Sequence, residues 1–211
     1  MPTASAPVFV ATFLSLLALI AGFFFLDIAL ARADRHQSSS HAAQLYDEGN
    51  VLLPSNPHEA SDRFASAHAI ARDDTRYALG LAQAMMADGR NDEAEQTLSD
   101  ALAHAANDGP LNLQMARLLD RTGRVGDATV YYHRAIFGRW AADSVERETE
   151  SRFELVALLA RQKDQSAILA ETLPLQAMLP VSSPMRHKLT LLLQGVHQDS
   201  LPPIGDAKRP E

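Results

Sequence analysis

The fold is decided by two consecutive stretches, LAQAMMADGRNDEAEQTLSDAL at residues 81–102 and MARLLDRTGRVGDATVYYHRAI at residues 115–136. The two align at an offset of 34 residues, and the same spacing reaches back into the segment that precedes them. A repeat of this length indicates that the chain is built from similar supersecondary units stacked one on another.

Five columns of the repeat keep their chemical character in three successive units. Two are alanine columns, one between them is large and apolar, one is acidic, and one favours a turn. In order of unit they hold Ala60, Ala94 and Ala128; Ala67, Ala101 and Ala135; Phe64, Leu98 and Tyr132; Glu59, Glu93 and Asp127; and Ser55, Gly89 and Gly123. Small residues let two helices approach, the large residue fills the gap between them, and glycine permits the joining turn. The columns therefore predict stacked helical hairpins.

This pattern resembles the tetratricopeptide repeat, a helical hairpin with a period of 34 residues. The resemblance covers three units, 41–74, 75–108 and 109–142. The first unit is weaker, because Ser55 replaces the turn glycine and Glu48 stands where the family has a small residue. The family's early aromatic residue is missing from every unit, where the chain has Gln44, Ala78 and Asn112. The chain is thus similar to a divergent member of the family.

Helix-start signals fall where the repeat places helix boundaries. Asn56, Pro57 and Glu59 are typical of an N-cap, a first-turn proline and a capping-box acid. Asp108 and Ser183 stand before two further helix starts that contain proline. These local signals support the predicted hairpins independently of the repeat.

After residue 142 the spacing of 34 fails, because a few residues are inserted before the next apolar helix. Residues 143–197 are predicted to form a degenerate fourth hairpin and a capping helix that shields the apolar end of the stack. The tail, 198–211, is predicted to be disordered because it has few apolar residues.

Residues 7–26 read PVFVATFLSLLALIAGFFFL, without a charged residue. Twenty residues at about 1.5 Å per residue match the ~30 Å hydrocarbon thickness of a bilayer. The predicted fold class is therefore all-α, with an N-terminal transmembrane helix followed by a tetratricopeptide-like α-solenoid. In this division the chain begins with a short tail, 1–6, and the helix, 7–30, is joined to the repeats by a linker, 31–40.

Two other interpretations of the apolar segment stay open. A buried core helix normally shows a polar stripe, whereas only Thr12 and Ser15 interrupt this one. A cleaved signal peptide is suggested by the small residues of Ala29-Leu30-Ala31. Against it, no Lys or Arg precedes the apolar run, the run exceeds the usual length of roughly 7–15 residues, and Asp27 separates it from the cleavage site.

The side of the membrane is also left open. Arg32 and Arg35 follow the span, and the positive-inside rule would keep the repeats cytoplasmic. Asp27 and Asp34 dilute this charge, so an exported domain is an alternative. We expect a single-pass protein of a bacterial inner membrane, with the repeats on either side.

Composition argues against several classes of chemistry. The chain has no cysteine, and its eight histidines show no metal-ligand spacing, so we expect no metal and no cofactor. A net charge of −7 without a basic run argues against nucleic acid as a partner. No catalytic motif is present, and solenoids present surfaces more often than enclosed pockets, so we do not expect an enzyme.

The resemblance implies a binding site, because ligands of the family lie on a concave face formed by the first helix of each unit. Transferred by column, the candidate partner-binding residues are Leu45, Leu79, Leu113, Arg76, Gln83, Met86, Arg117, Asp120 and Arg121. A leucine ladder that runs toward arginines predicts a partner segment with apolar anchors and some negative charge. An error of one residue in this phase would place part of the ladder in the core.

A second candidate patch consists of Arg134, Arg139 and Trp140, close to Phe137. Two cations beside aromatic rings invite a binding hypothesis. The alternative is that the rings pack the irregular junction into the fourth unit.

Together these features predict a membrane-tethered tetratricopeptide-type scaffold or assembly factor whose partner is a protein, part of a membrane complex. The alternative is an accessory or regulatory subunit of a membrane enzyme complex. A subunit would co-purify at a fixed ratio with one complex, whereas a scaffold would be recovered reversibly.

Overall fold

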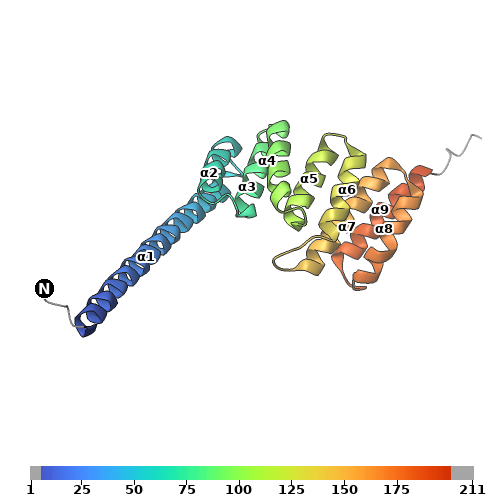
Figure 1. Ribbon diagram of the computed structural model, residues 1–211. Coiled ribbons are helices and arrows are strands. Elements are labelled where there is room, and N and C mark those ends of the chain that lie inside the picture. The colour runs from blue at the N-terminus through green and yellow to red at the C-terminus, as the bar shows by residue number, and fades with distance from the viewer. Residues whose placement is uncertain (1–5, 201–211) are drawn as a thin grey trace, which may run out of the picture.

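The computed structural model describes residues 6–200, which form nine α-helices joined by short turns (Figure 1). The helices are α1 Ala6–Leu52, α2 Pro57–Ile70, α3 Thr75–Ala87, α4 Asn91–His104, α5 Gly109–Arg121, α6 Val125–Ile136, α7 Ser144–Gln162, α8 Gln165–Met178 and α9 Pro184–Ser200. α1 projects as a long rod from a stack of the other helices. The predicted tails lie largely outside this range, at 1–5 and 201–211, while residues 198–200 belong to α9.

The stack consists of helix pairs in chain order. The last part of α1 pairs with α2, and the following pairs are α3 with α4, α5 with α6, and α7 with α8. α9 packs on α7 at the far end of the stack. The all-α, tetratricopeptide-like arrangement predicted from the repeat is confirmed by these helices.

The alanine and large-residue columns form the inside of the hairpins. Ala60, Ala94 and Ala128 are fully buried, because each lies where the second helix of a unit comes closest to its neighbour. The large residue one turn later in each unit is also buried, namely Phe64, Leu98 and Tyr132. The repeat in the sequence is therefore a repeat of core contacts.

Turns and caps follow the predicted chemistry. Gly89 and Gly123 have φ of 80° and 78°, the left-handed conformation that glycine adopts without steric cost. Asn56 accepts a hydrogen bond from the Glu59 backbone N–H at 3.3 Å and donates one to its carboxylate at 3.0 Å. Asp108 caps α5 by accepting from the Leu111 N–H at 3.0 Å.

The fourth unit departs from the period through its first helix. α7 has 19 residues, whereas α3 and α5 have 13 each. Lys163 takes the left-handed turn conformation, φ 58°, that glycine supplies in the two preceding units. The insertion noticed in the sequence is therefore an extension of about two turns to a first helix.

α1 differs from the predicted division of the N-terminal region. Residues 31–40, predicted as a linker, are part of one continuous helix that runs from Ala6 to Leu52. The physical reason is that no glycine or proline occurs between residues 23 and 48, so polar composition alone does not break the helix.

The apolar half of α1 has no packing partner among the described residues. Its large side chains from Phe13 to Leu30 are exposed, for example Phe24 at 66%. By length and composition this part of α1 can cross a membrane, and none of it is buried within the structure. The interpretation as a buried core helix therefore does not hold.

The turn geometry leads to a test with a matched pair of glycines. Gly123→Ala should lower the free energy of unfolding by about 1 kcal/mol, because the left-handed conformation penalises a Cβ. Gly126→Ala should raise it by up to about 1 kcal/mol, because Gly126 lies in α6 with open space around its Cβ position. Guanidinium unfolding followed by circular dichroism measures both changes. Equal effects of the two substitutions would contradict a left-handed backbone conformation at Gly123.

Candidate partner-binding face

The nine candidate partner-binding residues all lie on the first helices of the units, and we call the surface of these helices the first-helix face. It is built from the last part of α1 and from α3, α5 and α7. The regular turn after each first helix fixes the order of these helices, so equivalent columns of neighbouring units are brought side by side. Contacts across this face decide what it can bind.

The leucine ladder lies mostly inside the stack. Leu45 is 9% exposed and packs with Ala67 and Tyr77, and Leu113 is 5% exposed in the main core. Leu79 is partly buried against that core. The three leucines are therefore not the exposed apolar anchors that the columns predicted, because the helical phase turns these positions toward neighbouring helices.

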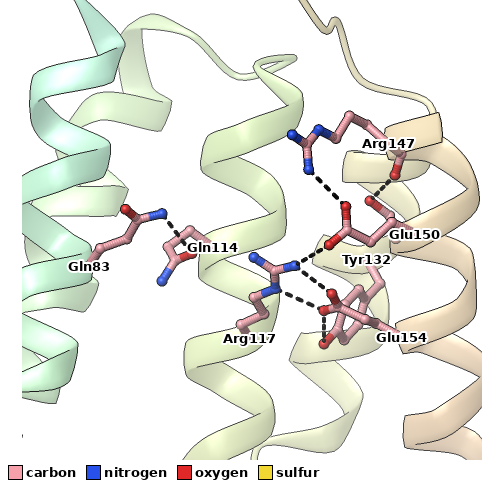
Figure 2. A network of polar contacts seen from close by, with 8 residues as sticks. Gln83, Gln114, Arg117, Tyr132, Arg147, Glu150 and Glu154 are labelled. Carbon is pink, nitrogen blue, oxygen red and sulfur yellow. Dashed lines mark hydrogen bonds and ion pairs between the residues drawn. The ribbon is translucent and has the colours of Figure 1, made fainter. Parts of the chain in front are cut away.

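In the middle of the first-helix face, hydrogen bonds of side-chain amides to an oxygen and to a sulfur join α3 and α5. Gln83 on α3 donates to the side-chain oxygen of Gln114 on α5 at 3.5 Å (Figure 2). The Gln114 amide in turn donates to the sulfur of Met86 at 2.9 Å, and Met86 is buried. Gln83 and Met86 therefore connect α3 to α5.

Arg117 forms the centre of a charged network between α5 and α7 (Figure 2). Its Nε donates to Glu154 at 2.9 Å, and its guanidinium pairs with Glu150 at 3.3 Å. Glu154 also accepts from the Tyr132 hydroxyl at 3.3 Å, and Arg147 pairs with Glu150 at 2.9 Å. The hydrogen bond to Glu154 raises the pKa of Arg117, and burial raises the pKa of Tyr132. This network connects the third unit to the fourth.

The remaining charged candidates also have partners within the chain. Asp120 pairs with Arg161 of α7 at 2.6 Å, and Arg121 donates to the side-chain oxygen of Asn91.

Arg76 is the most exposed of the candidates for which an ion pair is given. It pairs with Asp74 at 2.6 Å and lies over the Tyr77 ring, 5.7 Å from its centroid. Its hydrogen bond lowers the pKa of the Asp74 carboxyl. The arginines expected to read negative charge on a partner are therefore largely matched by acceptors of the chain itself.

The second candidate patch is tied into the junction between the third and fourth units. The Trp140 indole N–H donates to the Ala135 carbonyl at 3.0 Å, and a Cβ on Gly109 would lie only 2.5 Å from its ring. The Arg139 backbone exchanges hydrogen bonds with the segment that begins α5, donating to the Asn107 carbonyl and accepting from the Gly109 N–H. Arg134 stacks over Tyr131 at 4.9 Å. These contacts favour the packing interpretation of the patch.

Sequence reasoning missed Glu150, Glu154 and Gln114, which complete the contacts of the first-helix face. Glu154 lies 37 residues after Arg117, outside the period of 34, because α7 is extended. Only a charge-pairing argument that allowed for this extension could have found it. Among residues with described side chains, no three His, Asp or Glu converge as a metal site requires.

Residues 52–111 match the sequence model of the tetratricopeptide repeat family. This interval runs from the end of α1 to the start of α5, and it confirms the resemblance found from the repeat columns. No curated protein sequence matches the chain at a significant level.

Solved structures with a similar fold include bacterial secretion proteins. A crystal structure of the Yersinia enterocolitica type III secretion translocator chaperone SycD, in an alternative dimer, is 19% identical with a TM-score of 0.53, and the match covers 58% of this chain and 95% of that one. A T3SS complex from Aeromonas hydrophila is 18% identical with a TM-score of 0.51, over 59% and 84% of the two chains. A second SycD structure is 20% identical with a TM-score of 0.50, over 57% and 85%. At these identities the likeness concerns the fold.

The Arg117 network predicts a measurable coupling between α5 and α7. Arg117→Glu should destabilise the protein, because three carboxylates would then meet in a partly buried place. Adding Glu154→Arg to that variant should recover part of the loss. In a double-mutant cycle by guanidinium unfolding, a coupling of about 1 kcal/mol or more is expected, and strict additivity would contradict the network.

Proposed function

We propose that this tetratricopeptide-repeat chain is a membrane-tethered scaffold or assembly factor that binds a partner protein on the surface of its helical stack. The fold supports a binding role, since stacked hairpins present long helix faces rather than enclosed reaction sites. The neighbours point the same way, because a translocator chaperone acts on another protein.

The observation that carries the proposal is the exposed apolar half of α1. Large side chains from Phe13 to Leu30 face outward all around the helix, without a partner among the described residues. Exposed apolar area costs about 25 cal/mol per Å² in water, so such a surface requires a covering. A bilayer covers all sides of a single helix, which another folded protein does only by surrounding it.

The continuity of α1 adds a geometric argument for a partner at the membrane. Leu26 ends the uncharged run and His41 begins the first repeat, with no break in the helix between them. At about 1.5 Å per residue, the first repeat begins ~22 Å beyond the hydrocarbon. A stack held on so short and stiff an arm meets proteins of the same membrane more readily than distant soluble ones.

The tether is tested with a charged variant of the span. Leu16→Arg with Ile20→Arg should release the chain from membranes at alkaline pH, because each arginine near the bilayer centre costs about 2.5–3.5 kcal/mol of insertion. The matched control is Val130→Arg with Leu169→Arg, at exposed apolar positions of α6 and α8, which should stay in the membrane fraction.

The intact mass of the membrane-bound protein decides the signal-peptide alternative. The proposal requires a chain that retains residues 1–31. Alkaline release of the unmodified chain, or a mass that lacks these residues, would contradict the tether.

The scaffold role is tested by crosslinking the full-length chain in native membranes. A protein of a membrane complex should be recovered with the chain in substoichiometric and variable amounts. Recovery at a constant ratio with one enzyme complex would instead identify an accessory subunit, and recovery of lipid alone would contradict both roles.

A further inference from the structure

The N-terminal end of the stack carries an open hollow of about 800 Å³ that is lined only by α1 and α2. Its apolar lining consists of Ala43, Val51 and Leu52, and Val51 is 78% exposed. Polar and charged side chains complete the lining, namely Ser40, Gln44, Asp47, Glu48, Glu59 and Arg63. The hollow thus combines a small apolar floor with a rim of polar and charged side chains.

The opposite end of the stack shows how such a surface is closed. There α9 covers the last hairpin, and Leu189, 1% exposed, packs with Val156, Leu175 and Leu179. At the N-terminal end, α3 packs on one side of the first hairpin, and the hollow has no lining residue from any helix beyond α2. The first hairpin thus lacks a counterpart of α9 within the described part of the chain.

The charge of the hollow selects the kind of helix that fits. Its three carboxylates share one cation, since Arg63 lies 3.7 Å from Glu48 and 3.6 Å from Glu59. Asp47 has no ion-pair partner among the described residues. The hollow is therefore net negative around an apolar floor, which complements a helix with apolar and basic faces.

The direction of the hollow follows from the spacing of its lining residues on α1. Ser40, Ala43, Asp47 and Val51 recur at intervals of three and four, which places them in one stripe along the helix. A helix in this stripe runs beside α1, and α1 continues from there into the apolar span. The same line therefore leads the bound helix into the membrane.

We propose that this hollow binds a positively charged amphipathic helix that extends from a membrane-spanning segment of another protein. The proposal rests on the tether described under the proposed function. A second copy of this chain is a poor occupant through α1, because its own Asp47 and Glu48 would meet the same charges.

Site-specific photocrosslinking tests this directly. A photoreactive phenylalanine derivative at Val51 of the full-length chain, activated in native membranes, should form an adduct whose crosslinked peptide is basic and adjoins a transmembrane segment of another protein. The same derivative at Val130, an exposed valine of α6, should not form this adduct.

A charge reversal supplies the second measurement. With the derivative at Val51, Asp47→Lys should reduce the adduct about fivefold or more, since repulsion replaces attraction in the hollow. Asp100→Lys on α4 is the matched control and should leave the yield unchanged. An adduct within a second copy, with a neutral or acidic segment, or with a soluble protein would overturn the proposal, as would absence of any adduct.

The failure of this proposal is distinguishable from failure of the tether. A chain that stays in the membrane at alkaline pH but gives no basic adduct retains its tether and loses this partner. A chain that is released from membranes at alkaline pH has no membrane tether. In that case the partner helix has no reason to continue into the membrane, and both proposals fail.

Discussion

Close contact between the two helices of each hairpin is the constraint on which the rest of the structure depends. It requires a residue as small as alanine where the helices meet and a large residue one turn later, and the burial of Ala94 and Leu98 shows both. The first hairpin shows how close the contact is, because a Cβ on Gly49 would lie 2.7 Å from the Phe64 ring, and one on Gly80 of the neighbouring α3 would lie 2.8 Å from it. The distance between the packed helices determines which side chains reach the surface of the stack.

The sequence was sufficient to predict this part of the fold because the constraint recurs at a fixed interval. The alanine columns, the turn glycines and the Asn56 cap each have a local cause that is visible in residue type and spacing. That the helix continues through the predicted linker, 31–40, was not foreseen for a related reason. Polar residues after Ala31 indicate solvent exposure, but a helix that is exposed on all sides remains a helix when nothing breaks it.

The binding face was harder to predict because it depends on contacts between units. A shift of one residue in the alignment to the family's columns decides whether Leu113 faces a ligand or the core. The repeat columns do not define this alignment to within one residue. The partners of Arg117 lie beyond the extension of α7, so the regular period points to the wrong residues. Three of the charged residues that were expected to bind a partner, Arg117, Asp120 and Arg121, also connect neighbouring units, and their role in binding stays a prediction.

A consequence for function is that the stack has unequal surfaces. Along the first-helix face, cations are matched by acceptors of the chain, whereas the hollow beside α1 keeps unmatched negative charge and exposed apolar area. The surface best suited to a partner therefore lies at the end from which the apolar half of α1 projects. One continuous helix, α1, connects the hollow to the apolar segment and includes the predicted linker, 31–40.

The most direct test of the account is therefore a distance along α1. The chain has no cysteine, so spin labels at Phe24→Cys and Asp47→Cys of the full-length protein in lipid nanodiscs are free of background. For an unbroken helix we expect a single narrow distribution of the distance between the two labels, centred at about 35 Å, in a pulsed electron spin resonance measurement. A broad or markedly shorter distribution, or a protein that has lost its first label by cleavage, would contradict the claim that the apolar segment and the first repeat share one helix.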